Sequence, residues 1–195
     1  IDNAPNPYYF QSESRKNYFN RTSFTIEEWQ ELKNYAEEEI KIDFISSPFS
    51  LEAVDLLEKI NLKCYKVPSG EITNIPLLKK IAELGKPVLI STGMSSWDEI
   101  KEAVDIFNES KCNITILQCT SDYPCMPERS GLNIIKEMQK KFPGQSIGFS
   151  DHTEGFYAPI AAVVMGATVI EKHLTMQYVT TCTLNFSYCT RLSHR

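Results

Sequence analysis

The 195-residue sequence lacks several features that would assign it to a class at once. No apolar run approaches the ~18 residues that a membrane-spanning helix needs, and no signal peptide is visible. Neither a Gly-x-Gly-x-x-Gly fingerprint nor a phosphate-binding P-loop occurs, which disfavours a nucleotide-binding doubly wound fold. The formal net charge of -5 argues against nucleic acid or an anionic membrane as a partner, whereas local basic groups can still bind a small anion.

Paired cysteines are also absent. The six cysteines include no Cys-x-x-Cys pair and are sparse for a chain of this length. They predict reduced thiols in a cytoplasmic protein rather than a disulfide scaffold. The chain begins with Ile1 instead of Met, so we expect that this is not a natural start.

What the sequence does contain is a regular alternation of short apolar strands and helices. Residues 1–24 have no clean period and predict a loop, and Thr25 begins a helix that runs to about Glu39. Six strands are then predicted, at 43–47, 64–67, 87–91, 114–119, 146–149 and 167–170. Five helices separate them, at 51–60, 76–84, 97–108, 132–142 and 157–165. Without hairpin signals, this pattern predicts an α/β fold with parallel strands. It fits a doubly wound sheet or a (β/α)8 barrel that lacks two units, and both place sites at the carboxyl ends of the strands.

The first candidate site residues are Lys66, Ser69 and Glu71, in the segment Lys-Val-Pro-Ser-Gly-Glu. A lysine and a serine at a strand end can bind a phosphate or carboxylate, and Gly70 lets the backbone approach a ligand. Glu71 can accept hydrogen bonds from sugar hydroxyls or an amide. The alternative is a surface loop with a solvated lysine.

The second candidate is a pair of histidines. His152 and His173 follow two successive predicted strands, so neighbouring parallel strands would bring them within reach of one ion. Imidazole suits a divalent transition metal, and Asp151 and Glu171 could orient the two rings. The alternative is two unrelated loop histidines.

Further hydroxyl groups occur at the same predicted edge. Ser47, Ser121 and Ser150 each lie at or just after a strand, and Tyr123 follows Ser121 closely. Cys119 has no neighbour that would lower its pKa, so we expect it in the core.

Six stretches, in the same order along the chain, closely resemble the sialic acid synthase family, which includes legionaminic and pseudaminic acid synthases. They are FISSPFS (44–50), YKVPSGEITNIPLLKKIA (65–82), GKPVLISTGM (85–94), LQCTSDYP (117–124), IGFSDHT (147–153) and GATVIEKHLT (166–175). The resemblance covers roughly residues 25–175 and is absent after about residue 176.

The resemblance implies a (β/α)8 TIM barrel, of which about strands 3 to 8 are present. The family condenses phosphoenolpyruvate with an N-acetylated amino sugar, such as N-acetylmannosamine, and releases phosphate. It requires a divalent cation, Mn²⁺ or Mg²⁺. The resemblance also implies a domain-swapped homodimer for the full-length parent.

The resemblance further implies roles for individual residues. Lys66 and Glu71 are the expected catalytic residues, and His152 and His173 the metal ligands. The phosphoenolpyruvate contacts implied are Ser47, Lys66, Ser69, Ser121 and Ser150. Glu71 and Tyr123 match residues on the amino-sugar side.

The sequence also departs from the family. The first two strands and the C-terminal antifreeze-like domain have no counterpart, so we expect a partial catalytic barrel over residues 1–175 and a divergent tail over 176–195. One alternative is therefore a truncated, inactive fragment that only binds substrate or a partner. Another is a Schiff-base aldolase on the same scaffold that uses Lys66 or Lys172.

Overall fold

The computed structural model describes residues 14–174 and 187–191. The chain divides into two compact units, Ile1–Phe44 and Ile45–Arg195. Among the described residues, no helix has both the length and the apolar character needed to span a membrane.

The first unit is helical. It contains α1 (Arg15–Thr22), α2 (Ile26–Asn34) and a π-helix, η1 (Tyr35–Ile40). The prediction of a loop over 1–24 is therefore wrong for α1, which Ser14 caps by accepting a hydrogen bond from the backbone of Asn17. The polar composition of α1 gave no helical period. The helix from Thr25 is confirmed, although its final part takes the π form.

The second unit is built on a sheet with strand order β1-β2-β3-β4-β5-β6. Its strands are β1 (Tyr65–Val67), β2 (Val88–Ser91), β3 (Ile114–Cys119), β4 (Ser146–Asp151), β5 (Val169–His173) and β6 (Ser187–Arg191). Strands β1 to β5 pair in parallel with their chain neighbours, and β6 pairs antiparallel with β5. The predicted parallel α/β architecture is confirmed.

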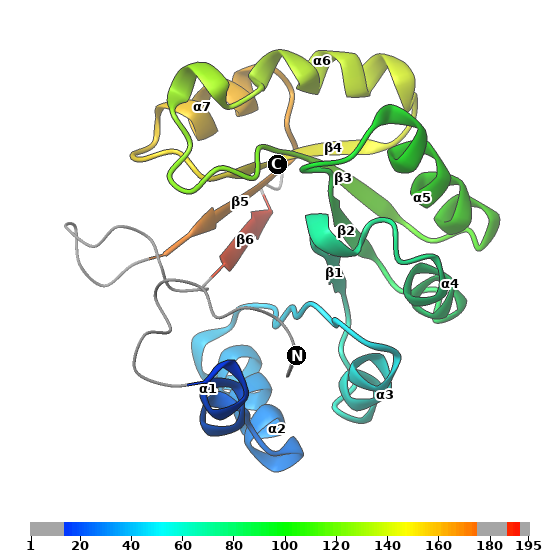
Figure 1. Ribbon diagram of the computed structural model, residues 1–195, viewed down its shortest axis with the longest axis vertical. Helices are drawn as coiled ribbons and strands as arrows, with labels where there is room; N and C mark the ends of the chain where they lie inside the picture. Colours follow the sequence, from blue (N-terminus) through cyan, green and yellow to red (C-terminus); the bar gives the residue numbers. More distant parts are fainter. Residues whose placement is uncertain (1–13, 175–186, 192–195) are drawn as a thin grey trace. The chain divides into compact units, whose positions relative to one another are not determined.

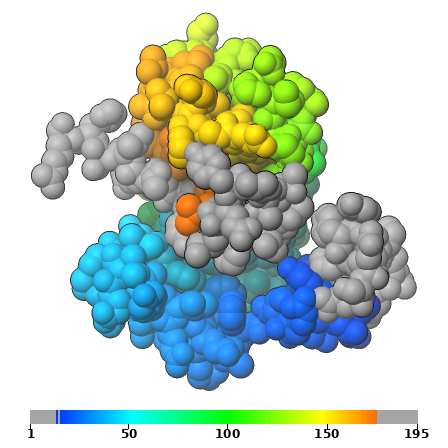
Figure 2. Space-filling view, turned by 90° about the vertical axis from the view of Figure 1, so that its left-hand side faces the viewer, coloured from blue at the N-terminus to red at the C-terminus, as the bar shows by residue number. Residues whose placement is uncertain are grey.

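Helices connect the parallel strands and cover one face of the sheet (Figure 1). They are α3 (Leu51–Lys59), α4 (Ile75–Glu83), α5 (Trp97–Glu109), α6 (Leu132–Lys141) and α7 (Tyr157–Val164). Two 3-10 helices, η2 (Ser69–Glu71) and η3 (Pro127–Arg129), lie in the loops after β1 and β3. Helix α7 contributes to the yellow and orange surface in Figure 2. Its exposed apolar residues are Tyr157, Ile160 and Val164.

The five parallel strands are strongly curled. In a flat sheet, the first and fifth strands would lie about 19 Å apart, at roughly 4.8 Å per strand. Yet Lys66 Nζ on β1 lies 3.3 Å from Glu171 Oε2 on β5. Because even two long side chains cannot span the flat distance, the sheet must bend toward itself, as Figure 1 shows.

Strand alternation divides the side chains between the two faces of this curled sheet. On the outer face, buried aliphatic and aromatic residues such as Tyr65, Ile90, Ile116 and Phe149 face the helices. On the inner face, Leu89, Leu117 and Val169 form an apolar cluster. Two residues farther along the strands, toward their carboxyl ends, the side chains on the inner face are polar. A polar layer therefore lies above this apolar cluster.

Three strand predictions need correction. The strand predicted at 43–47 is reduced to a single parallel bridge between Ser46 and Tyr65. The strands predicted at 146–149 and 167–170 extend to Asp151 and His173 respectively. The antiparallel strand β6 lies in the predicted tail and was not expected; the rest of residues 176–195 falls outside the described residues.

Candidate functional site

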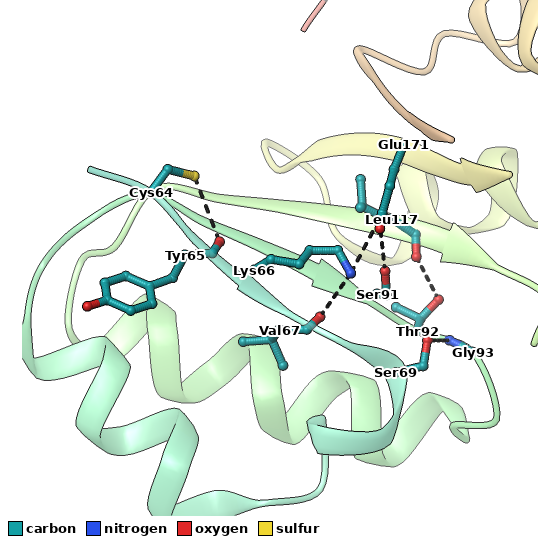
Figure 3. Close-up of polar contacts among 10 residues, drawn as sticks. All are labelled: Cys64, Tyr65, Lys66, Val67, Ser69, Ser91, Thr92, Gly93, Leu117 and Glu171. Carbon is teal, nitrogen blue, oxygen red and sulfur yellow. Dashed lines mark hydrogen bonds and ion pairs between the residues drawn. The ribbon is translucent and has the colours of Figure 1, made fainter. Parts of the chain in front are cut away.

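The centre of the candidate site is Lys66, whose side chain points into the concave face of the sheet (Figure 3). The residue is only 9% exposed. Its ammonium lies 3.3 Å from Glu171 Oε2 and 3.5 Å from the carbonyl of Val67. Ser91 Oγ on β2 is 3.5 Å from the same Glu171 oxygen. A buried carboxylate thus holds a lysine and a serine from two other strands.

A second group of polar atoms meets at Gly93, in the turn after β2. The backbone N–H of Gly93 donates to Ser69 Oγ at 3.0 Å (Figure 3). A Cβ at Gly93 would overlap Ser121 Oγ, lie 2.8 Å from Ser69 Oγ and lie 3.2 Å from Cys119 Sγ. The loops after β1, β2 and β3 therefore bring two hydroxyl groups and a backbone amide together, because Gly93 has no side chain.

The other predicted ligand-binding residues occupy different positions along the same edge. Ser150 is buried on β4, with Cys119 and Glu171 as its neighbours across the ladder. Ser47 is half-buried and follows Ser46, whose carbonyl accepts a hydrogen bond from the Lys66 backbone. Glu71 is half-buried at the end of η2, and its carboxylate accepts a 2.8 Å hydrogen bond from Asn74.

The two predicted metal-binding histidines lie close together. The ring centroids of His152 and His173 are 5.3 Å apart. The Tyr123 ring packs against both of them. Its centroid lies 3.9 Å from that of His152 and 5.5 Å from that of His173, which it meets edge-on. Neighbouring strands therefore bring the two imidazoles together, as expected, and the tyrosine ring packs beside both.

The environment of the imidazoles favours their neutral form. Burial lowers the pKa of His152, and the nearby His173 lowers it further, although a hydrogen bond to the Thr120 carbonyl opposes both effects. Burial likewise lowers the pKa of His173, against an opposing effect of Glu171. His152 Nδ1 lies 2.7 Å from the Thr120 carbonyl oxygen. His173 Nδ1 is buried without a hydrogen-bond partner, which is costly for a polar atom.

Asp151 and Glu171, which were expected to orient the two rings, do not bond either imidazole directly. Asp151 bonds Lys172 and the Thr153 backbone, and Glu171 bonds Lys66 and Ser91. The partner recorded for His152 is a backbone carbonyl, that of Thr120. The reason is strand alternation: Asp151 lies on the opposite face of β4 from its neighbour His152.

Sequence reasoning missed two contacts of the site and left one residue open. Glu171 was not identified as the partner of Lys66, and the carbonyl of Thr120 was not considered. Ser91 lies in the stretch 91–94, which fitted either a further part of the site or a tight turn. Each depends on which strands become neighbours in the curled sheet. Only the alternation of Ser91 with Leu89, and of Glu171 with Val169, could have shown that these side chains share the inner face.

Taken together, this edge offers an ammonium, several hydroxyl groups, a backbone amide and two neutral imidazoles. Such a set can bind an anion through charge-assisted hydrogen bonds and can supply nitrogen ligands to a metal. Among the described residues, no group of three or more His, Cys, Asp or Glu side chains is arranged to hold an ion.

Comparison with known proteins places this geometry in context. A family model described as the NeuB family matches residues 3–183, a longer range than the expected 25–175. The chain is 46% identical over 138 residues to the N,N'-diacetyllegionaminic acid synthase of Campylobacter jejuni, covering 69% of this chain and 41% of that protein. It is 42% identical over 153 residues to the N-acetylneuraminate-9-phosphate synthase of Mus musculus, covering 78% of this chain and 42% of that protein.

A solved structure shows the same fold. The N-acetylneuraminic acid synthetase of Leptospira borgpetersenii, crystallised with citrate, aligns with a TM-score of 0.77 at 31% identity. The alignment covers 85% of this chain and 58% of that one. The present chain spans less than half the length of the two curated relatives described above.

Proposed function

This chain belongs to the NeuB family, and from that premise we propose that it is part of an incomplete (β/α)8 barrel that condenses phosphoenolpyruvate with an N-acetylated amino sugar. The products would be a nonulosonic acid and phosphate. Synthases of legionaminic acid and of N-acetylneuraminate 9-phosphate among its relatives support this reaction class. The acceptor would be N-acetylmannosamine or a related sugar.

The observation that carries the proposal is the convergence of Lys66 with the serine hydroxyls. Lys66 is buried on the inner face, beside Ser91 and Glu171. Ser69 and Ser121 meet at Gly93, in the loops above it. Phosphoenolpyruvate carries a phosphate and a carboxylate, and preorganised cationic and hydroxyl groups would hold both in a fixed orientation. Ser47 and Ser150 are proposed to complete this set.

The two histidines fit a divalent cation, Mn²⁺ or Mg²⁺. Both imidazoles are shifted toward the neutral form that binds metal, and the buried Nδ1 of His173 has no hydrogen-bond partner. The hydrogen bond to Thr120 uses His152 Nδ1 and leaves Nε2 for an ion. When bound, the cation would act as a Lewis acid that polarises the sugar aldehyde.

The remaining contribution of the protein to the reaction would be to position the two substrates. Carbon 3 of phosphoenolpyruvate would bond to the aldehyde carbon, water would add at carbon 2, and phosphate would leave with cleavage of its carbon–oxygen bond. Lys66 would stabilise the charge of the departing phosphate, and Ser69 would fix its orientation. Tyr123 and Glu71 would contact the sugar. Tyr123 is 56% exposed, so its hydroxyl edge is accessible from solvent.

The aldolase alternative is less well supported by the geometry. A Schiff-base lysine must lose its proton to act as a nucleophile. Lys66 is ion-paired with Glu171, and Lys172 is ion-paired with Asp151. In each pair the lysine nitrogen already lies against a carboxylate. Borohydride trapping with a keto acid tests this directly, and we expect no adduct.

The test of the proposal is titration of the 195-residue chain with phosphoenolpyruvate in the presence of Mn²⁺, followed by a phosphate-release assay with candidate sugars. We expect binding that is lost in Lys66→Met. Lys86→Met is the matched control, because Lys86 also forms a part-buried ion pair but lies just before the amino end of β2. Circular dichroism checks that each variant is folded, since Lys66→Met leaves the Glu171 carboxylate unpaired.

Each outcome separates the alternatives. Phosphate release that requires both metal and sugar supports condensation. Binding without release supports the truncated, binding-only reading of this chain. Absence of phosphoenolpyruvate binding, or equal losses in the two lysine variants, contradicts the proposed role of Lys66.

A further inference from the structure

A second polar cluster lies on the opposite face of the sheet from the candidate site. It joins Asp151 at the end of β4 to Lys172 on β5, two residues that are direct partners in the parallel register. The Asp151 side chain is fully buried, and that of Lys172 is 24% exposed. Neither residue was assigned a role in binding phosphoenolpyruvate, sugar or metal.

The hydrogen bonds of this cluster involve the residues on both sides of His152 in the sequence. Lys172 Nζ donates to the Asp151 carboxylate and, at 2.7 Å, to the Thr153 carbonyl. The other Asp151 oxygen accepts the Thr153 backbone N–H at 2.9 Å. The residues immediately before and after His152 are therefore held by one lysine. That lysine immediately precedes His173 in the sequence.

Strand alternation keeps this lysine away from any ligand in the concave site. Successive side chains on a strand point to opposite faces, so Lys172 lies opposite Glu171 and His173. Glu171 reaches Lys66 on the inner face, which confirms the direction of its neighbours. Lys172 contacts neither imidazole, so apart from the effect of its charge on His173 it influences them through the backbone to which they are attached.

From this geometry we propose that Asp151 and Lys172 are positioning residues that set the separation and orientation of His152 and His173. The inference rests on the proposed function, in which these two imidazoles bind a divalent cation. The ion pair links the strand that carries one imidazole to the loop that carries the other. Residues that orient metal ligands from outside the coordination sphere commonly affect metal affinity by about 10- to 100-fold.

The second unit offers a matched control for a purely structural ion pair. Lys86 Nζ donates to Glu58 and, at 2.7 Å, to the Leu62 carbonyl. Its side chain is 23% exposed, close to the value for Lys172. Like Lys172, it combines a carboxylate with a backbone carbonyl. Lys86, however, precedes β2, at the end of the strands away from the histidines.

The experiment compares Lys172→Met with Lys86→Met in the full 195-residue chain. Mn²⁺ binding is measured by electron paramagnetic resonance, well below the unfolding temperature of each variant. We expect Lys172→Met to weaken Mn²⁺ binding by about tenfold or more. Lys86→Met should change the Kd by no more than about twofold, since distant sites act independently. Because Lys172→Met leaves the Asp151 carboxylate buried and unpaired, the neutral double variant Asp151→Asn/Lys172→Met is measured as well and should show the same loss.

A metal-free measurement tests the positioning directly. In ¹H–¹⁵N spectra of the imidazoles, Lys172→Met should shift or broaden the signals of His152 and His173. Lys86→Met should leave both signals in place. Unchanged imidazole spectra and unchanged Mn²⁺ affinity in Lys172→Met overturn the inference, as do equal effects in the two lysine variants. If the unaltered chain binds no Mn²⁺, the proposed metal site fails, and the imidazole spectra alone decide the positioning role.

Discussion

At the scale of single residues, the candidate site depends on glycines, which have no side chain, as much as on its polar residues. Gly93 lets Ser69 and Ser121 approach the same backbone amide, since a Cβ there would meet both hydroxyl groups. Gly70, in the segment next to Ser69, has open space around it, with no atom within 4 Å of an added Cβ. The two glycines therefore make opposite predictions.

We predict that Gly93→Ala weakens phosphoenolpyruvate binding by roughly five- to 150-fold, the range expected when about 1–3 kcal/mol of hydrogen bonding is lost. Gly70→Ala should leave the affinity unchanged. Isothermal titration of the two variants provides the comparison. Loss of binding in Gly70→Ala would instead show that the ligand approaches the backbone closely at Gly70.

Two buried thiols lead to a second prediction at this scale. Burial raises the pKa of both Cys112 and Cys125 above the usual range of a thiol. Since the thiolate is the reactive form, both should react slowly with iodoacetamide at pH 8 in the native chain and at ordinary rates in urea. Alkylation should accelerate only as the pH rises above about 9. Peptide mass spectrometry measures each site separately, and rapid native labelling of either thiol at pH 8 would contradict the prediction.

At the scale of secondary-structure elements, capping explains where several helices begin. The capping box of α2 pairs Thr25 with Glu28, and that of α5 pairs Ser96 with Glu99. In α5, Ser96 Oγ accepts the Glu99 backbone N–H at 3.3 Å while the Glu99 carboxylate accepts the Ser96 N–H at 2.7 Å. The hydrogen bonds that this carboxylate accepts from the Ser96 N–H and from the Ser96 hydroxyl lower the pKa of the Glu99 carboxyl. The helix that follows the Gly93 turn is thus anchored at its start.

We predict that Ser96→Ala lowers the free energy of unfolding by about 1 kcal/mol, because the first turn of α5 loses a capping hydrogen bond. Ser96→Thr, which retains a hydroxyl group, should lose much less. Urea unfolding followed by circular dichroism measures both variants. Equal losses in the two would show that the hydroxyl group does not stabilise the helix.

At the scale of the sheet-bearing unit, stability depends on the apolar cluster on the inner face of the sheet, which lies beneath the polar layer. Leu89, Leu117 and Val169 come from three strands and pack together, with Ile45 and Cys64 against them. Gly148 lies beneath Leu117, and a Cβ there would overlap the leucine and come within 2.6 Å of the Val169 carbonyl. A small residue on β4 therefore allows a large one from β3 to fill the concave side.

We predict that Leu117→Ala destabilises this unit by about 2–5 kcal/mol, the cost of deleting a buried leucine side chain. Val164→Ala, on the exposed side of α7, should change stability by no more than about 0.5 kcal/mol. Thermal or urea unfolding distinguishes the two. Similar effects would mean that Leu117 is not part of a close-packed core.

Much of this architecture could be predicted from the sequence. Apolar runs bounded by polar turn residues located five of the six predicted strands, and helical periods located the helices between them. The polar residues at the strand ends, from Lys66 to His173, identified the edge of the sheet where the site lies. These features are local, because propensity, periodicity and capping act over a few neighbouring residues.

The elements that sequence reasoning misjudged are those with weak local signals. The polar helix α1 has no apolar stripe, and the strand expected at 43–47 forms only one bridge. The strand β6 depends on pairing with β5, which no local pattern specifies. In each case, hydrogen bonding or packing with a partner decides the conformation.

The sequence by itself determined where the five parallel strands lie, which edge carries polar groups and which side chains have the chemistry to bind an anion or a metal. Only the tertiary structure decided which of these groups meet. The curl of the sheet brings Lys66 to Glu171 from strands that would lie far apart in a flat sheet. Strand alternation then assigns Glu171 to Lys66, and Asp151 to Lys172 instead of to the histidines. The Lys66–Glu171 pair depends on closure between residues about a hundred positions apart, whereas local propensity acts only along the chain.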